Sequence, residues 1–111
     1  MEKLSIGQVV LAYFPFSDLK RKKLRPCLII GISEYDDILM CQITSQLYDG
    51  KRVIPLNSTS FKEGSIVVNS FIRPDKIATI DKKMIKKILG TLKLNKINEV
   101  KVGLRSVFEL D

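Results

Sequence analysis

Histidine is absent from the 111-residue chain. Without an imidazole, the chain cannot form a histidine-based catalytic triad, a histidine metal site or a nuclease site with paired histidines. A glycine-rich phosphate loop is also missing, and the carboxylates lack the spacing of a metal site or a two-carboxylate hydrolase. We therefore expect neither a metal site nor an organic cofactor.

Cysteine is scarce, with only Cys27 and Cys41, and each lies within an apolar run. Two lone cysteines form neither a zinc motif nor a disulfide framework. A free cysteine usually behaves as a small buried hydrophobic residue. We predict two buried free thiols in a reducing compartment.

Long hydrophobic runs are absent as well. The N-terminus lacks a signal-peptide pattern, and no segment approaches the length of a membrane span. The chain is 45% hydrophobic, which suffices for a core. We expect one cytoplasmic domain over residues 1–111, without a membrane partner.

Basic residues are in excess, with 19 Lys and Arg against 12 Asp and Glu and a net charge of +7. Such an excess favours an anionic partner, and nucleic acid is the commonest one. The alternative is a basic but inert surface, because many lysines serve only solubility.

Short strand-like segments dominate the chain. Strands are predicted over residues 6–14, 27–32, 38–44, 51–56, 65–72, 76–80 and 85–92. Asp49-Gly50 predicts a hairpin turn and Pro55 an edge strand. Residues 57–64 are predicted as a polar loop and residues 73–75 as a turn. Asp81 is expected to cap one helical turn, and Gly90 to mark a bend or bulge; a helix over 85–92 is the weaker alternative.

The C-terminal segment predicts an amphipathic helix. Asn95 is the expected N-cap, and apolar residues then recur at helical spacing at Ile97, Val100, Leu104, Val107 and Phe108. Short strands with one terminal helix predict a mainly β fold, a small barrel with a helix packed on it.

The most unusual segment is basic, since five of the six residues from Lys20 to Arg25 are Lys or Arg. It lies between two predicted strands, where a rigid frame would present it as a loop. Lys20, Arg21, Lys22 and Lys23 are candidate phosphate-binding residues. A solvated turn and a localisation signal remain alternatives.

Candidate catalytic groups border the predicted strands. Pro26 biases Arg25 toward an extended backbone, which would hold its guanidinium in place to stabilise phosphate charge. Thr44 and Ser45 supply adjacent hydroxyls that could hold a phosphate oxygen or a 2′-hydroxyl, although an ordinary strand end is the better explanation of this dipeptide alone.

Arg73 and Asp75 form a second pair of candidate RNA-binding residues, and Asp75 could instead serve as a base, pair with Arg73 or shape the turn. Four aromatic residues near these loops could stack on unpaired bases, although the core is the better assignment for the first and last: Phe14, Phe16, Tyr48 and Phe71.

The ordered set of motifs resembles the MazF/PemK toxin family. The segments that carry the resemblance are residues 7–11, 14–18, 25–30, 43–45, 67–73 and 78–82. The resemblance implies an SH3-like barrel with a C-terminal helix, usually a homodimer. It also implies endoribonuclease activity on single-stranded RNA and a cognate antitoxin whose acidic tail occupies the basic groove.

By the same resemblance, Arg25 matches the family's catalytic arginine, Thr44 its active-site Thr or Ser, and Arg73 a further arginine of some members. The chain departs from the family at Gln8, where an acidic residue is usual, and in the first loop, whose only carboxylate is Asp18. The general base therefore stays open between Asp18, Asp75 and water.

Two other classes fit the same positive charge. A barrel of the CcdB type binds DNA gyrase without catalysis, and a nucleic-acid-binding barrel holds RNA without cutting it. Neither needs Arg25 and Thr44 together.

Overall fold

Seven antiparallel strands, one α-helix and two 3-10 turns make up the described part of the computed structural model, which covers residues 3–15, 23–46, 50 and 53–110. The strands are β1 (Gln8–Tyr13), β2 (Leu24–Ile32), β3 (Asp37–Thr44), β4 (Ile54–Leu56), β5 (Phe61–Gly64), β6 (Ser70–Asp81) and β7 (Ile85–Leu92). The 3-10 turns are η1 (Ser58–Ser60) and η2 (Lys82–Met84), and the helix is α1 (Leu94–Phe108).

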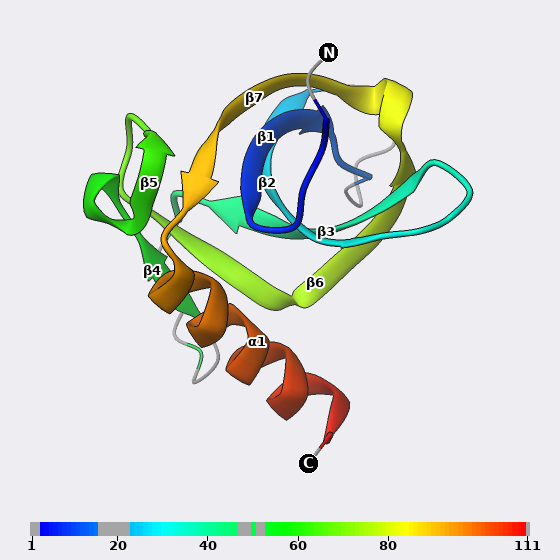
Figure 1. The fold of residues 1–111 in the computed structure, drawn as a ribbon. Coiled ribbons are helices and arrows are strands. Elements are labelled where there is room, and N and C mark those ends of the chain that lie inside the picture. The colour runs from blue at the N-terminus through cyan, green and yellow to red at the C-terminus, as the bar shows by residue number, and fades with distance from the viewer. Residues whose placement is uncertain (1–2, 16–22, 47–49, 51–52, 111) are drawn as a thin grey trace.

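The strands form one sheet in the order β4-β6-β3-β2-β1-β7-β5. The sheet curls strongly, as a half-barrel, and α1 lies beside β6 and β4 (Figure 1). Pro55 lies on the edge strand β4, as predicted. The predicted class, mainly β with a C-terminal helix, is confirmed.

Alternating side chains build two apolar clusters, because successive strand residues face opposite sides of the sheet. In β2, Leu28 belongs to one cluster, whereas Cys27 and Ile29 belong to the other. The cluster with Leu28 also contains Val100 of α1, so the helix completes the core on that side. The two-sided burial of β2 explains its continuous apolar sequence.

A bulge in β6 replaces the turn predicted at residues 73–75. Cys41 lies opposite Ile77 while its neighbour Gln42 lies opposite Arg73, so residues 74–76 have no partners on β3. Pro74 has no N–H to donate to the ladder, and a bulge accommodates it without a lost hydrogen bond. The strand therefore continues through the proline, and the two predicted strands at 65–72 and 76–80 are one strand that begins at Ser70.

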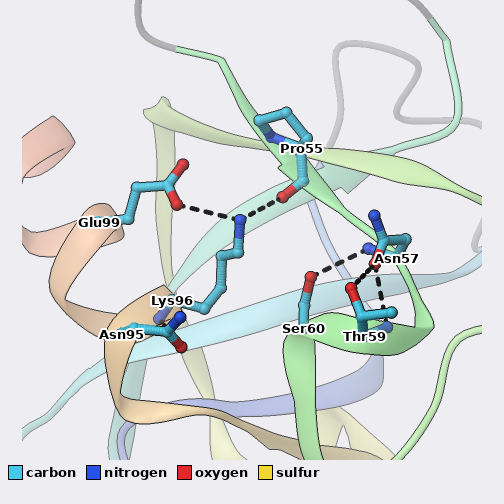
Figure 2. Close-up of polar contacts among 7 residues, drawn as sticks. All are labelled: Pro55, Asn57, Thr59, Ser60, Asn95, Lys96 and Glu99. Carbon is cyan, nitrogen blue, oxygen red and sulfur yellow. Dashed lines mark hydrogen bonds and ion pairs between the residues drawn. The ribbon is translucent and has the colours of Figure 1, made fainter.

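The segment before β6 also differs from the prediction. Residues 65–69 are not a strand, whereas β5 occupies Phe61–Gly64 within the predicted polar loop. Before β5, Asn57 caps η1: its side chain accepts a hydrogen bond from the Thr59 N–H at 3.0 Å, and Ser60 Oγ accepts one from the Asn57 N–H at 3.2 Å (Figure 2). This capping box orders a polar sequence that composition alone assigns to a loop.

The predictions for residues 81–92, a capped turn followed by a strand with a bulge, are confirmed. Asp81 caps η2 through a hydrogen bond from the Lys83 N–H at 2.8 Å. Residues 85–92 form a strand rather than a helix. A register shift against β1, between Val9 opposite Gly90 and Val10 opposite Ile88, leaves Leu89 as the extra residue of a bulge, next to the predicted glycine.

The helix α1 begins at Leu94, and its N-cap is Lys93 rather than the predicted Asn95. The Lys93 carbonyl accepts hydrogen bonds from Lys96 and Ile97, both at 3.0 Å, so Asn95 already lies inside the first turn. Of the predicted apolar face, Val100 is buried but Phe108 is 58% exposed.

A lysine ties the helix to the sheet edge. Lys96 Nζ donates a hydrogen bond to the Pro55 carbonyl of β4 and pairs with Glu99, both at 3.0 Å (Figure 2). The edge-strand carbonyl at Pro55 therefore has a partner from α1, which helps to cover that edge of the sheet.

Candidate nucleic-acid cleft

An open cleft of about 640 Å³ lies at the ends of β2 and β3. Its lining comes from β2 and β3, from the segment between β5 and β6, and from single residues of β1 and β7. Its lining residues are Leu11, Arg25, Pro26, Gln42, Ile43, Thr44, Ser45, Gln46, Ser65, Ile66, Val67, Val68, Ser70 and Leu89. All three predicted catalytic residues, Arg25, Thr44 and Ser45, are therefore brought to one surface.

Strand register explains why Arg25 and Thr44 meet. Cys27 of β2 lies opposite Gln42 of β3 in an antiparallel ladder. Because the strands are antiparallel, moving two residues back along β2 and two residues forward along β3 brings Arg25 opposite Thr44. Arg25 is exposed, and its backbone lies opposite Ala12 of β1. The sheet, and not the preceding loop, therefore fixes the backbone of Arg25.

A short-range hydrogen bond holds the Thr44 hydroxyl. Thr44 Oγ1 accepts a hydrogen bond from the Gln46 backbone N–H at 3.2 Å. This contact leaves the hydroxyl hydrogen available to donate, since a threonine hydroxyl can accept and donate at once. Thr44 can therefore donate to a phosphate oxygen or a ribose oxygen in the cleft.

Gln42 is the cleft residue that the sequence analysis missed. Its side chain is 8% exposed, and its Oε1 has no hydrogen-bond partner in the described part of the chain. A polar residue within the otherwise apolar run from Leu39 to Ile43 was the available signal, because a buried amide needs a partner.

Arg73 and Asp75 form an ion pair of their own outside the cleft lining. The Arg73 guanidinium donates to both carboxylate oxygens of Asp75, with Nε–Oδ1 at 3.1 Å and Nη2–Oδ2 at 2.6 Å. A fork of this kind occupies both carboxylate oxygens with charge-assisted hydrogen bonds. Arg73 lies opposite Gln42 in the ladder, next to the cleft, but neither member of the pair is among its lining residues.

Only some of the other residues predicted to contact RNA lie within the described part of the chain. Lys23, the residue that precedes β2, is exposed. Phe14 is buried in the core, as expected, whereas Phe71 is only half-buried. The remaining candidates lie outside the described residues: Asp18, Lys20, Arg21, Lys22, Phe16 and Tyr48.

Both cysteines are free and buried, as predicted. Burial raises the pKa of the Cys27 thiol to about 12, with a further contribution from the neighbouring Cys41. Burial likewise raises the pKa of Cys41 to about 12, and the charge of Asp75 adds to the effect. The two thiols are therefore neutral near pH 7 and unsuited to act as nucleophiles.

Within residues 3–15, 23–46, 50 and 53–110, no group of three or more Cys, Asp or Glu side chains is arranged to hold a metal ion. In the same ranges, α1 is too short and too polar to cross a membrane, and no other helix could do so.

The fold is shared by solved structures of endoribonucleases and MazF toxins. The chain superposes on an endoribonuclease from a mycobacterial species with a TM-score of 0.75 at 18% identity, over 99% of this chain and 95% of the other. It matches an endoribonuclease in complex with its cognate antitoxin, also mycobacterial, with a TM-score of 0.77 at 17% identity, over 98% of each chain.

A MazE–MazF structure from Deinococcus radiodurans gives a TM-score of 0.73 at 17% identity, over 97% of each chain. The model of the PemK-like, MazF-like toxins of type II toxin–antitoxin systems matches residues 5–108, and the chain belongs to this family. No curated protein matches the sequence.

Proposed function

We propose that this chain is an endoribonuclease toxin that cuts single-stranded RNA without a metal ion. The main observation behind the proposal is that Arg25 and Thr44 line the same open cleft of a MazF-like fold. The net charge of +7 supports an RNA substrate, because each phosphate contact releases counterions.

In the proposed reaction the RNA supplies the nucleophile. Its 2′-hydroxyl oxygen forms a bond to the adjacent phosphorus as the bond to the 5′-oxygen breaks, which gives a cyclic phosphate and a 5′-hydroxyl end. The Arg25 guanidinium binds the phosphate and stabilises the charge that develops on it. Thr44, with Ser45 beside it, donates to the phosphate or orients the 2′-hydroxyl.

The 2′-hydroxyl gives its proton to a base, and the departing 5′-oxygen takes a proton from water. The described carboxylates constrain the choice of base. Asp75 is engaged by Arg73 and lies outside the cleft lining. We therefore favour water or Asp18 over Asp75 as the group that takes the proton. Arg73 then acts mainly by holding Asp75, and its contribution to RNA binding is secondary.

The proposed partners follow from the family and the charge. A cognate antitoxin with an acidic tail would compete with RNA for the cleft, since both present anionic groups to Arg25 and to the basic residues from Lys20 to Lys23. The solved relatives include toxins in complex with antitoxins. We also propose a homodimer, the usual assembly that the family resemblance implies.

The test is incubation of the purified protein with a long single-stranded RNA in EDTA, followed by sequencing of the fragment ends. We expect discrete cuts with 5′-hydroxyl ends. RNA that stays intact but is retained in a gel shift would contradict catalysis and favour a binding barrel. RNA that is neither cut nor retained would make gyrase binding the next hypothesis.

A further inference from the structure

We propose that Gln42 recognises one nucleobase of the bound RNA through its side-chain amide, and so sets part of the sequence preference of this cleft. The inference rests on the proposed function, because it names the chemistry that the same cleft selects. It assigns a role to a residue that neither the catalytic mechanism nor the core of the fold uses.

The Gln42 amide is buried without serving the fold. Its neighbours in β3, Cys41 and Ile43, are core residues, and the Gln42 side chain itself is 8% exposed. No donor among the described residues reaches its Oε1. A buried acceptor without a donor destabilises the folded state. A bound ligand that donates a hydrogen bond to Oε1 would remove this cost, which gives the glutamine a reason to be at this position.

The chain provides an internal comparison. The other buried glutamine, Gln8, is 9% exposed, and its Oε1 accepts a hydrogen bond from the Ser5 N–H at 2.8 Å. Gln8 thus serves the fold and lies outside the cleft, whereas Gln42 lines the cleft and has an unmatched acceptor.

The place of Gln42 suits a group next to the scissile phosphate. Gln42 and Thr44 lie two residues apart on β3, so they share a face and are separated by about 6.6 Å along the strand. Both line the cleft with Arg25. A phosphate held by Arg25 and Thr44 would therefore bring a neighbouring nucleotide against Gln42.

The chemistry of the amide selects a base over a phosphate. Phosphate oxygens only accept hydrogen bonds and cannot satisfy Oε1, whereas a base edge carries an N–H donor beside an acceptor. A glutamine amide offers the complementary pair, as in its bidentate contact with adenine. Exposed base edges of this kind are typical of single-stranded RNA.

The test compares the parent with Gln42→Met, which keeps the side-chain length without hydrogen bonding, and with Gln8→Met as the matched control. Each protein is incubated with a random single-stranded RNA pool, and both the retained RNA and the cut ends are sequenced. Thermal unfolding of each variant is measured in parallel.

We expect the parent to prefer one base at one position, and Gln42→Met to lose that preference by roughly 10- to 100-fold. The Tm of Gln42→Met should equal or exceed that of the parent, while Gln8→Met should unfold at a lower temperature with the preference intact. A Gln42→Glu variant, which keeps an acceptor but loses the donor, should change the identity of the preferred base, an effect that a purely structural role cannot produce.

An unchanged preference in Gln42→Met, or a parent without base preference, overturns the inference even when RNA is cut. A ribose contact by Gln42 would give that result, because every nucleotide carries the same 2′-hydroxyl. Base-selective retention without cutting, lost in Gln42→Met, supports the inference and contradicts the proposed nuclease. A parent that neither retains nor cuts RNA contradicts both.

Discussion

At the scale of single residues, the buried thiols couple stability to alkaline pH. The pKa of Cys27 and of Cys41 rises from an ordinary value of 9.0 to about 12 in the folded chain. Between these values the unfolded chain loses the thiol protons while the folded chain keeps them. Because the unfolded state then binds fewer protons, the free energy of unfolding falls as pH rises through this window.

We therefore predict that the contribution of the two thiols to stability is fully present below about pH 9 and is lost progressively toward pH 12. Urea unfolding at several pH values measures the decrease. A Cys27→Ala/Cys41→Ala variant, less stable at pH 7 because of the two small cavities, should show a shallower decrease. Parallel pH profiles for the two proteins would contradict the assignment.

The site residues were predictable to different degrees. Arg25 and Thr44 were singled out because the ordered set of motifs resembles a known family, whereas each dipeptide alone is a weak signal. The strand register then brings the two residues to one cleft. Gln42 was missed because its significance depends on burial and on an absent partner, which are tertiary properties. Arg73 pairs with Asp75 beside the cleft and is not among its lining residues, and its role in RNA binding stays a prediction.

At the scale of elements, two glycines allow β5 and β7 to approach closely. Gly64 has a φ of +73°, and it lies opposite Gly90. A Cβ at Gly90 would overlap the Glu63 carbonyl oxygen and would lie 2.8 Å from Phe61 Cδ2. Much of that obstacle is backbone, which cannot rotate away, so the pairing depends on the absent side chain.

We predict that Gly90→Ala lowers the free energy of unfolding by about 1–3 kcal/mol, the usual range for overpacking. Urea unfolding measures the loss. Gly31→Ala is the matched control, since its Cβ would meet Leu39 at 3.4 Å, an ordinary contact, and should change stability by less than about 0.5 kcal/mol. Equal stability of the two variants would contradict the close approach.

The elements show where local sequence is sufficient and where it is not. Strand β2 and helix α1 were predicted because their apolar patterns match their burial. The turn predicted at residues 73–75 was wrong because Pro74 lies in a bulge and packs near α1, where a Cβ on Gly103 would lie 3.2 Å from Pro74 Cγ. Strand β5 was missed because its pairing with β7 is long-range and its sequence is polar.

At the scale of the whole molecule, the curled sheet presents a cleft on a strongly basic chain. The class of fold followed from short strands and a terminal helix, whereas the strand order, in which β1 and β7 lie side by side, depends on contacts distant in sequence. The net charge of +7 applies to the whole surface, so it predicts affinity for RNA rather than a sequence preference.

We predict that affinity for single-stranded RNA falls steeply with salt, since each neutralised phosphate adds about 0.7 to the slope of log K against log salt. The exposed Lys23 should contribute one such contact. Titrations of labelled RNA at several salt concentrations should show a smaller slope for Lys23→Ala with the same cut sites. A slope near zero for the parent would contradict electrostatic binding of RNA.

The most direct test of the central claim is the single-turnover rate of RNA cutting, in EDTA, by the parent, Arg25→Ala and Arg25→Lys, with folding and assembly verified for each. The account predicts that Arg25→Ala loses roughly 10²–10³-fold in rate, by analogy with the loss of one oxyanion-stabilising donor. Arg25→Lys should recover only part of the rate, because a lysine keeps the charge without the planar fork. Cutting by folded Arg25→Ala at the parent rate would contradict the assignment of this cleft as the active site.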